Sequence, residues 1–509
     1  MDKKVRVRFA PSPTGGLHLG GVRTVLYNYL FAKQRQGDFV LRIEDTDQTR
    51  YVPGAEEYIV ECLKWCGLEP DESPEKGGKF GPYRQSERKD LYKQYADDLV
   101  KNGFAYYAFD TPEELDNMRK EFKTPEDSSP QYGHRIRMKM RNSLTLQKEE
   151  LDALLEKGTP YVIRFLMPED EEASFTDMIR GEVKFNTHTL DDKVLLKADG
   201  MPTYHLAVVV DDHLMQITHI FRGEEWLPST PLHLLLWDRL GWKEEIPHYA
   251  HLPLILKPDG KGKLSKRDGD RLGFPVYAMQ WADPKTGVVT KGFREIGFLP
   301  DAFNNMLALL GWNDGTEKEI FSLDELVEKF SIERVHKGGA KFNFEKAKWF
   351  NHEYIKQSDS HRLLPFLKET LRDKNIQERD SRLLAILDLI KERCTLVPDI
   401  WENSYFFFQR PVDYDVESVR KKWDSDKKEF FELLPDTFST VEVFTSEVLE
   451  SAFKLLAEKM NQKAGGLMLP LRVMLVGSKF GPPVFHIAEL LGKEETLERI
   501  KIALPVIEE

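Results

Sequence analysis

Residues 11–21 read PSPTGGLHLGG, a run that sets His18 between two pairs of glycines. Before it, the alternation of basic and apolar residues over 4–9 predicts a short strand. After it, apolar residues at helical spacing over 19–36 predict a helix. The apolar run 39–43 then predicts a second strand. Strand, Gly-rich turn, helix and strand form a βαβ unit, so we expect the α/β class with a parallel sheet.

We expect a ligand site at one edge of this sheet, because parallel sheets bind ligands outside the carboxyl ends of their strands. The run 11–21 follows the first strand and Glu44 follows the second, so both fall at that edge. Glycines permit close backbone approach, and the N-terminus of a helix favours an anion. We place His18 one turn into the helix, where its ring can donate to a phosphoryl oxygen. The run therefore predicts a phosphate site.

The sheet pattern resumes far along the chain. Residues 203–211 (TYHLAVVVD) and 215–221 are apolar runs that predict two further strands. Residues 229–231 (STP) then open a helix, since proline is tolerated in a first helical turn. The charged stretch 85–200 between the two halves predicts helices and short strands. We interpret it as an insertion into a split α/β domain.

A second basic loop contains KLSKR at residues 263–267. It follows a buried-looking strand over 251–256 and a Pro-Asp-Gly turn, so we expect it to leave the same sheet. Lys263 and Lys266 can bring positive charge to a phosphoryl group. A solvated lysine-rich loop is the alternative for this segment taken alone.

The chain is long enough for several domains, since single cores stop growing at about 250–300 residues. Of its 509 residues, those after about 340 form mostly amphipathic helices, for example over 381–394 and 446–460. The formal charge of −12 argues against nucleic acid when taken alone. The basic runs 134–141 and 257–271 nevertheless permit an anionic partner, because local charge decides binding.

Segments that would direct the chain to a membrane or out of the cell are not evident. No apolar run reaches the ~18 residues of a membrane span, and the first residues have no apolar stretch typical of a secretory signal. The three cysteines (Cys62, Cys66 and Cys394) form neither a disulfide framework nor a paired zinc motif. We expect a cytoplasmic protein.

Five blocks of the sequence together resemble a known family. They are residues 8–15 (RFAPSPTG), 41–47 (LRIEDTD), 202–212 (PTYHLAVVVDD), 222–230 (RGEEWLPST) and 263–267 (KLSKR). The glycine run with His18 and the KLSKR loop resemble the two signatures of class I aminoacyl-tRNA synthetases. In detail the blocks are similar to bacterial-type glutamyl-tRNA synthetases.

The resemblance implies a split Rossmann fold, a doubly wound parallel sheet, with three appended regions. It implies a catalytic domain in two halves, an inserted acceptor-stem domain, a stem-contact region containing the KLSKR loop and an all-α anticodon-binding domain. The corresponding ranges are 1–85 with 200–257, 86–199, 258–340 and 341–509.

The resemblance also implies the reaction. Members of the family activate L-glutamate with ATP and Mg²⁺ to glutamyl-adenylate, then transfer the glutamyl group to the 3′-terminal adenosine of tRNA-Glu. The partners implied are L-glutamate, ATP and tRNA-Glu, and the tRNA is bound at its acceptor stem and its anticodon. The resemblance also implies a monomer that does not associate with a membrane. Because residues 104–110 contain no cysteine, we predict no zinc and no metal ligands from the protein.

Site residues follow from the matching positions. The catalytic positions implied are His18, Lys263 and Lys266. Those implied to bind ATP are His18, Gly20, Gly21 and Lys266. Those implied to bind substrate are Arg8, Ala10, Ser12, Glu44, Tyr204, Arg222 and Trp226. Arginine suits a dicarboxylate because its guanidinium pairs bidentately with carboxylate, and Glu44 suits an α-ammonium.

Several alternatives stay open beside this interpretation. A glutaminyl-type enzyme is disfavoured by Ser12 and Thr14, and a short glutamyl-queuosine enzyme by the helical C-terminal third. A non-catalytic tRNA-binding paralogue is disfavoured by the retained His18 and Lys266. A general nucleotidyltransferase would share His18 and the phosphate loop, but it is disfavoured by the helical C-terminal region and the pair Arg8 and Arg222. Charging of tRNA-Gln as well as tRNA-Glu remains open. Gly21 replaces the second histidine of many class I enzymes, and residues 276–297 have no functional interpretation.

Overall fold

The computed structural model describes residues 3–125, 127–265 and 268–508. The chain forms two compact units. One comprises Met1–Glu295 with Pro300–Phe344, and the other Ile296–Leu299 with Glu345–Glu509. Among the described residues, no helix is both long and apolar enough to cross a membrane.

The first unit is built on a four-stranded parallel sheet in the order β2-β1-β8-β9. Its strands are β1 (Arg6–Phe9), β2 (Asp38–Leu41), β8 (His219–Gly223) and β9 (His248–Leu252). Strands that are far apart in the chain are therefore neighbours, since β8 pairs with β1. The predicted parallel βαβ unit and the split of the sheet are confirmed.

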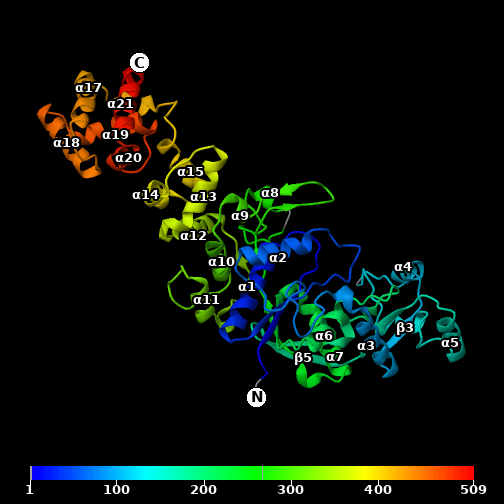
Figure 1. Cartoon of the computed structure of the whole chain (residues 1–509). Coiled ribbons are helices and arrows are strands. Elements are labelled where there is room, and N and C mark those ends of the chain that lie inside the picture. Colours follow the sequence, from blue (N-terminus) through cyan, green and yellow to red (C-terminus); the bar gives the residue numbers. More distant parts are fainter. Residues whose placement is uncertain (1–2, 126, 266–267, 509) are drawn as a thin grey trace. The chain divides into compact units, whose positions relative to one another are not determined.

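Helix α1 (Leu19–Gln34) connects β1 to β2 (Figure 1). Its buried face includes Val22, Val25 and Leu26. Just beyond its end, a Cβ on Gly37 would lie 2.4 Å from the carbonyl oxygen of Val5. Glycine therefore allows the return strand to approach β1 closely.

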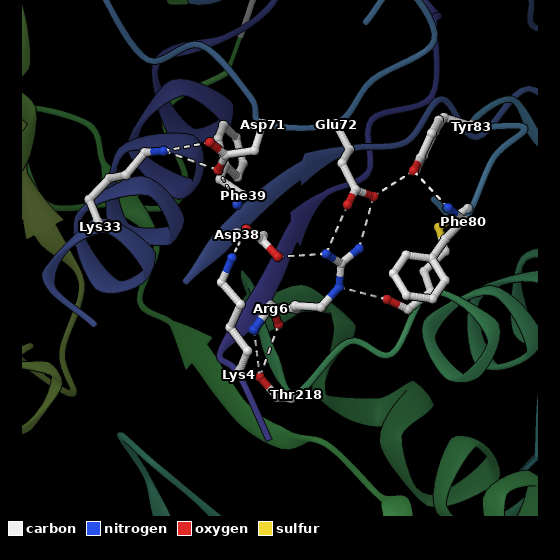
Figure 2. Close-up of polar contacts among 11 residues, drawn as sticks. Lys4, Arg6, Lys33, Asp38, Phe39, Asp71, Glu72, Phe80, Tyr83 and Thr218 are labelled. Carbon is white, nitrogen blue, oxygen red and sulfur yellow. Dashed lines mark hydrogen bonds and ion pairs between the residues drawn. The ribbon is translucent and has the colours of Figure 1, made fainter. Parts of the chain in front are cut away.

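A polar cluster at the start of β1 ties the sheet to the loop beyond α2 (Ala55–Trp65), and Figure 2 shows it. The Arg6 guanidinium donates to Glu72 at 3.0 and 2.9 Å and to Asp38 at 2.8 Å. Its Nε donates to the carbonyl oxygen of Met215 at 2.9 Å. The hydroxyl of Tyr83 also donates to Glu72. The buried guanidinium of Arg6 is thus paired with two carboxylates.

One predicted strand is a helix. Residues 203–211 were expected to join the sheet, but Tyr204–Leu214 forms helix α6. Its apolar run, residues 206–210, is buried on all sides, against α3 (Lys89–Lys101) and α7 (Thr230–Arg239) among others. A continuous apolar run is compatible with a buried strand and with a buried helix, so periodicity alone misassigned it.

The neighbouring strand is displaced for a related reason. The predicted strand 215–221 is observed as β8, which begins at His219. Met215 caps α6 and Gln216 has φ of 55°, so residues 215–216 turn the chain before the strand starts. The predicted helix after residue 229 is confirmed as α7.

The insertion between the sheet halves contains a three-stranded antiparallel sheet and a hairpin. Its strands are β3 (Ala105–Ala108), β4 (Val162–Phe165) and β7 (Val194–Leu196), with the hairpin β5 (Glu172–Asp177) and β6 (Gly181–Asn186). Its helices are α3, α4 (Pro112–Glu121) and α5 (Lys148–Glu156). Side chains of α3, β4 and β7 share one hydrophobic cluster with α6 and α7. The insertion is therefore packed onto the domain of the parallel sheet through a common core.

The strand before the basic loop is broken. Residues 251–256 were expected to form one strand of the main sheet, but β9 ends at Leu252 and β10 (Ile255–Leu256) pairs with β13 (Ala340–Lys341). Pro253 separates them, and proline has no N–H to continue a ladder. The loop with Lys263 therefore leaves β10 rather than the main sheet.

The rest of the first unit consists of short elements. They are α8 (Asp268–Leu272), β11 (Trp281–Ala282), β12 (Val289–Thr290), α9 (Phe293–Ile296), α10 (Pro300–Leu309) and α11 (Leu323–Lys329). Helices α10 and α11 pack against α1.

The second unit is helical in its described residues (Figure 1). Its elements are α12 (Phe344–Gln357), α13 (Ser360–Asp373), α14 (Asp380–Ile390), α15 (Asp399–Glu402), α16 (Val416–Arg420), α17 (Ser425–Ser439), α18 (Ser446–Lys459), α19 (Ala464–Val476), α20 (Val484–Leu491) and α21 (Lys493–Glu508). The helices predicted over 381–394 and 446–460 are confirmed as α14 and α18, although α14 ends four residues earlier than expected.

Candidate active site

A cavity of about 970 Å³ opens at the carboxyl ends of β1, β2 and β8. The backbone N–H of Glu44 donates to the carbonyl oxygen of Pro11 at 2.9 Å, which joins the segments that follow β1 and β2. The predicted site residues that line the cavity are Arg8, Ala10, Ser12, His18, Gly20, Gly21, Glu44, Tyr204, Arg222, Trp226 and Lys263. Lys266 lies outside the described residues. The structure thus brings together residues from five separate stretches of chain.

Arg222 is a buried cation whose described partners are all neutral. Its Nε donates to Nε2 of His251 at 3.0 Å, and its Nη2 donates to the hydroxyl of Thr230 at 2.8 Å. Its Nη1 donates to the hydroxyl of Tyr204 at 3.1 Å and lies 3.3 Å from Nδ1 of His233. A buried charge with no carboxylate in direct contact is costly, so this guanidinium is suited to an anionic ligand.

The histidines around Arg222 are held neutral. Burial lowers the pKa of His233 well below its usual value, and the positive charge of Arg222 lowers it further. Burial likewise lowers the pKa of His205, which contacts His233, to about 4. These rings therefore contribute hydrogen bonds rather than charge at neutral pH.

Arg8 is more occupied than the sequence implied. It was expected to present its guanidinium to substrate, but its Nε and Nη2 donate to the two carboxylate oxygens of Asp212 at 3.1 and 3.2 Å. Among the described residues its Nη1 has no protein acceptor. Arg8 lines the cavity and has Nη1 left for a ligand, because Asp212 holds its Nε and Nη2.

Two further charges of this cluster were missed by the sequence reasoning. Arg42 is fully buried, and it donates to Asp212 at 2.8 Å and to Glu44 at 3.0 Å. Burial raises the pKa of Glu44, against the opposing effect of Arg42 and Arg8. Burial would also raise the pKa of Asp212, but Arg8 and Arg42 outweigh it and lower that pKa. Their only sequence signal was a charge within or directly after an apolar run, Arg42 within 39–43 and Asp212 after 203–211.

His18 lies at the start of α1 rather than one turn into it. It is the N-cap residue, and its Nδ1 accepts from the backbone N–H of Gly20 at 3.2 Å. Since Nδ1 is the acceptor, the ring proton is on Nε2. The ring is thus oriented as a donor at the positive end of the helix.

The segment that lacked an interpretation packs against this motif. Leu19 donates from its backbone N–H to the carbonyl oxygen of Val276 at 3.0 Å. A Cβ on Gly16 would lie 2.8 Å from the ring of Tyr277 and 2.9 Å from that of Trp281. Gly16 is therefore needed for aromatic packing, and residues 276–281 brace the glycine run.

Trp226 and Lys263 form the outer wall of the cavity. Trp226 is 41% exposed, and its ring lies 4.5 Å from that of Tyr204. Nζ of Lys263 lies 2.5 Å from Oε1 of Glu225. Both side chains are therefore only partly buried.

No group of three or more His, Cys, Asp or Glu side chains is placed to hold a metal ion in the part of the chain that the structure describes. The absence of zinc stays a prediction. The charged groups that line the cavity include Arg8, Arg222 and Glu44, and they lie beside the start of α1.

Comparison with known proteins agrees with this geometry. Residues 4–349 match the family model "tRNA synthetases class I (E and Q), catalytic domain", and residues 360–504 match an anticodon binding domain. The chain is 52% identical over 507 residues to a glutamate–tRNA ligase of Phocaeicola vulgatus, covering 99% of each protein. It is 54% identical over 508 residues to one of Flavobacterium johnsoniae, covering all of both.

Solved structures show the same likeness. A glutamate tRNA ligase from Elizabethkingia meningosepticum, crystallised in complex with its amino acid, superposes with a TM-score of 0.95 at 51% identity over 99% of this chain and 100% of that one. A glutamate-tRNA synthetase from Elizabethkingia anophelis gives a TM-score of 0.92 at 52% identity, with the same coverage. This chain therefore belongs to the glutamate–tRNA ligases, a family of class I aminoacyl-tRNA synthetases.

Proposed function

We propose that the chain joins L-glutamate to ATP as glutamyl-adenylate and then transfers the glutamyl group to the 3′-terminal adenosine of tRNA-Glu. The observation that carries this proposal is Arg222, a buried guanidinium whose direct partners among the described residues are neutral. The side-chain carboxylate of glutamate would supply the anion that Arg222 lacks, whereas the neutral side-chain amide of glutamine would not.

The remaining groups fit the other parts of glutamate. Oε1 of Glu44 is taken by Arg42, which leaves Oε2 for the α-ammonium. Tyr204 accepts from Arg222, so its own hydroxyl proton can be donated to a carboxylate. Burial raises the pKa of Tyr204, although the positive charges of Arg222 and Arg8 oppose this, so the hydroxyl keeps the proton that it would donate. We assign Ala10, Ser12 and Trp226 to the walls of this subsite.

The phosphate subsite is assigned to the start of α1 and the basic loop. The α-carboxylate of glutamate attacks the α-phosphorus of ATP, a new C–O–P linkage forms, and the bond to pyrophosphate breaks. His18 offers its Nε2–H there, Gly20 and Gly21 line the cavity without side chains that would block a phosphate, and Lys263 with Lys266 offers charge to the departing pyrophosphate. The ribose hydroxyl of the tRNA then attacks the glutamyl carbonyl and AMP leaves.

Mg²⁺ fits this site as a companion of ATP. Phosphate oxygens and water satisfy most of its coordination, so it needs no dedicated cage of protein ligands. Its role when bound is to neutralise phosphate charge.

We assign the ranges 1–85 with 200–257 to catalysis, 86–199 to the acceptor stem, 258–340 to stem contacts and 341–509 to the anticodon. The family models match 4–349 and 360–504, which supports a catalytic part followed by an anticodon-binding part. We propose that the chain acts as a monomer in the cytoplasm.

The decisive test is charging of purified tRNA-Glu and tRNA-Gln transcripts with labelled glutamate, ATP and magnesium. Labelling of tRNA-Glu alone is expected for a discriminating ligase. Labelling of both would mean that the product on tRNA-Gln needs a later amidation. Folded protein that labels neither would overturn the proposal.

A further inference from the structure

The polar chain behind Arg222 extends beyond the residues that the family resemblance singles out. Arg222 lies on β8, and its Nε donates to Nε2 of His251 on β9. Nδ1 of His251 lies 2.6 Å from Oδ2 of Asp177, the last residue of β5 in the insertion. His251 is fully buried and Asp177 is 1% exposed. Three elements thus meet through one line of hydrogen bonds.

The direction of each hydrogen bond in this chain is determined. A guanidinium has only donors, so Nε2 of His251 must accept, and the ring proton must be on Nδ1 facing Asp177. The hydroxyl of Thr230 accepts from Arg222 and lies 3.3 Å from the same Nε2. Burial lowers the pKa of His251, which keeps the ring neutral with this tautomer.

Asp177 is itself fixed and cannot turn away from the ring. Its Oδ1 accepts from the backbone N–H groups of Ile179 and Arg180, each at 2.9 Å. Its Oδ2 also accepts from the backbone N–H of His251 at 3.1 Å. These bonds and that to the ring lower its pKa although burial opposes them. The hairpin turn of the insertion therefore holds a carboxylate that selects the tautomer.

We propose that His251 and Asp177 are positioning residues for Arg222 in the recognition of the substrate carboxylate. The inference rests on the proposed function, since it assumes that Arg222 binds glutamate. Protein acceptors take four of the five N–H groups of Arg222 among the described residues. His251 holds the Nε edge, so the guanidinium keeps a fixed plane, and Nη2 retains one N–H for a ligand in the cavity that Arg222 lines.

The alternative is that His251 merely fills space between two strands, and substitutions separate the two roles. In His251→Gln, an amide oxygen replaces Nε2 as acceptor. In His251→Leu, a side chain of similar volume offers no acceptor. In Asp177→Asn, the amide can donate to Nδ1 of His251, so the ring proton moves to Nε2. The Nε2–H then faces the Nε–H of Arg222, and the hydrogen bond between them is lost. Replacing a carboxylate that orients a histidine by its amide has this effect in other proteins.

The test is calorimetric titration of the full chain with L-glutamate and, separately, with ATP. We expect His251→Leu to weaken glutamate binding about 10- to 100-fold, the range for a lost hydrogen bond to a charged group, and to leave ATP binding unchanged. We expect Asp177→Asn to act in the same direction and His251→Gln to stay within about threefold of the wild type. His248→Leu, an exposed position on the same strand, is the control.

The outcomes are distinct. Wild-type protein that binds ATP but no glutamate would overturn the proposed function itself. Wild-type protein that binds glutamate, with His251→Leu and Asp177→Asn binding it equally well, would overturn the positioning role alone. If His251→Leu does not fold, the comparison of Asp177→Asn with the wild type decides the matter. Equal losses in the Leu and Gln variants would assign His251 to packing.

Discussion

Nζ of Lys263 lies 2.5 Å from Oε1 of Glu225, so the first lysine of the KLSKR loop is paired with a carboxylate of the RGEEWL segment. The two side chains are 52% and 41% exposed. Exposed pairs of this kind contribute little to stability. An incoming phosphate can therefore take over the lysine at small cost.

Replacing Glu225 tests this exchange. Glu225→Gln should tighten ATP binding about two- to fivefold, because Lys263 is released and one negative charge beside the cavity is removed. The affinity for glutamate should not change. Titration with ATP measures the effect, and Glu224→Gln is the neighbouring control, since Glu224 pairs with Arg180 instead. Unchanged or weaker ATP binding in Glu225→Gln alone would exclude competition between the carboxylate and phosphate.

Arg222→Lys tests whether a positive charge is sufficient at the proposed carboxylate subsite. Lysine keeps the charge but cannot hold four acceptors in one plane, so we expect the KM for glutamate to rise about 100-fold while that for ATP stays constant. Steady-state charging with each substrate varied gives both values. Arg239→Lys, on the outer face of α7, should behave like the wild type. An equal rise in both KM values would indicate a general structural defect.

Asp212→Asn tests the buried charge cluster. The change removes the carboxylate that Arg8 and Arg42 share, and it leaves two buried guanidinium groups short of an anion. We expect the free energy of unfolding of the first unit to fall by about 3–5 kcal/mol. Thermal unfolding followed by circular dichroism measures it. Asp238→Asn removes the partner of Arg239 in an ion pair that is less buried, and it should lower the free energy of unfolding by less than about 1 kcal/mol. Similar losses in both variants would contradict the special role of the cluster.

The cluster of Figure 2 predicts a pH-dependent contribution to stability. Burial would raise the pKa values of Glu72 and Asp38, but hydrogen bonds from Arg6 to both carboxylates, with those from Tyr83 and Lys4, lower them. A carboxylate whose pKa is lower in the folded state stabilises the fold above its unfolded pKa, and it loses that effect as pH falls through the folded value.

We therefore expect Arg6→Gln to lower the free energy of unfolding near neutral pH by about 3 kcal/mol, which is seen as a lower melting temperature. The difference from the wild type should begin to shrink below about pH 4, the ordinary pKa range of carboxyl groups, and should be lost as pH falls through the lowered folded-state pKa values of Glu72 and Asp38. Melting curves across this pH range provide the measurement. Lys33→Gln, whose pair with Asp71 is more exposed, is the control. A difference that persists unchanged at low pH would mean that Arg6 acts through packing.

Short-range sequence patterns predicted much of the fold. The βαβ unit was predicted from the glycine run between two apolar stretches, and helix α7 from the Ser-Thr-Pro sequence that opens it. Helices α14 and α18 were predicted from their amphipathic periodicity. Helix α6 was mistaken for a strand, because a wholly buried helix loses the periodicity that would identify it. Pro253 split the strand before the basic loop, a break that the apolar pattern did not disclose.

The sequence by itself determined which residues were expected at the cavity. The ends of the first two strands indicated His18 and Glu44, and the family resemblance indicated Arg8, Tyr204, Arg222 and Trp226, all of which line it. What those residues contact was decided only by the tertiary structure. Arg8 reaches Asp212 across 204 positions of sequence, and Asp177 reaches His251 across 74. Buried charges must find partners wherever the packed chain provides them, and that choice depends on three-dimensional proximity rather than on local pattern.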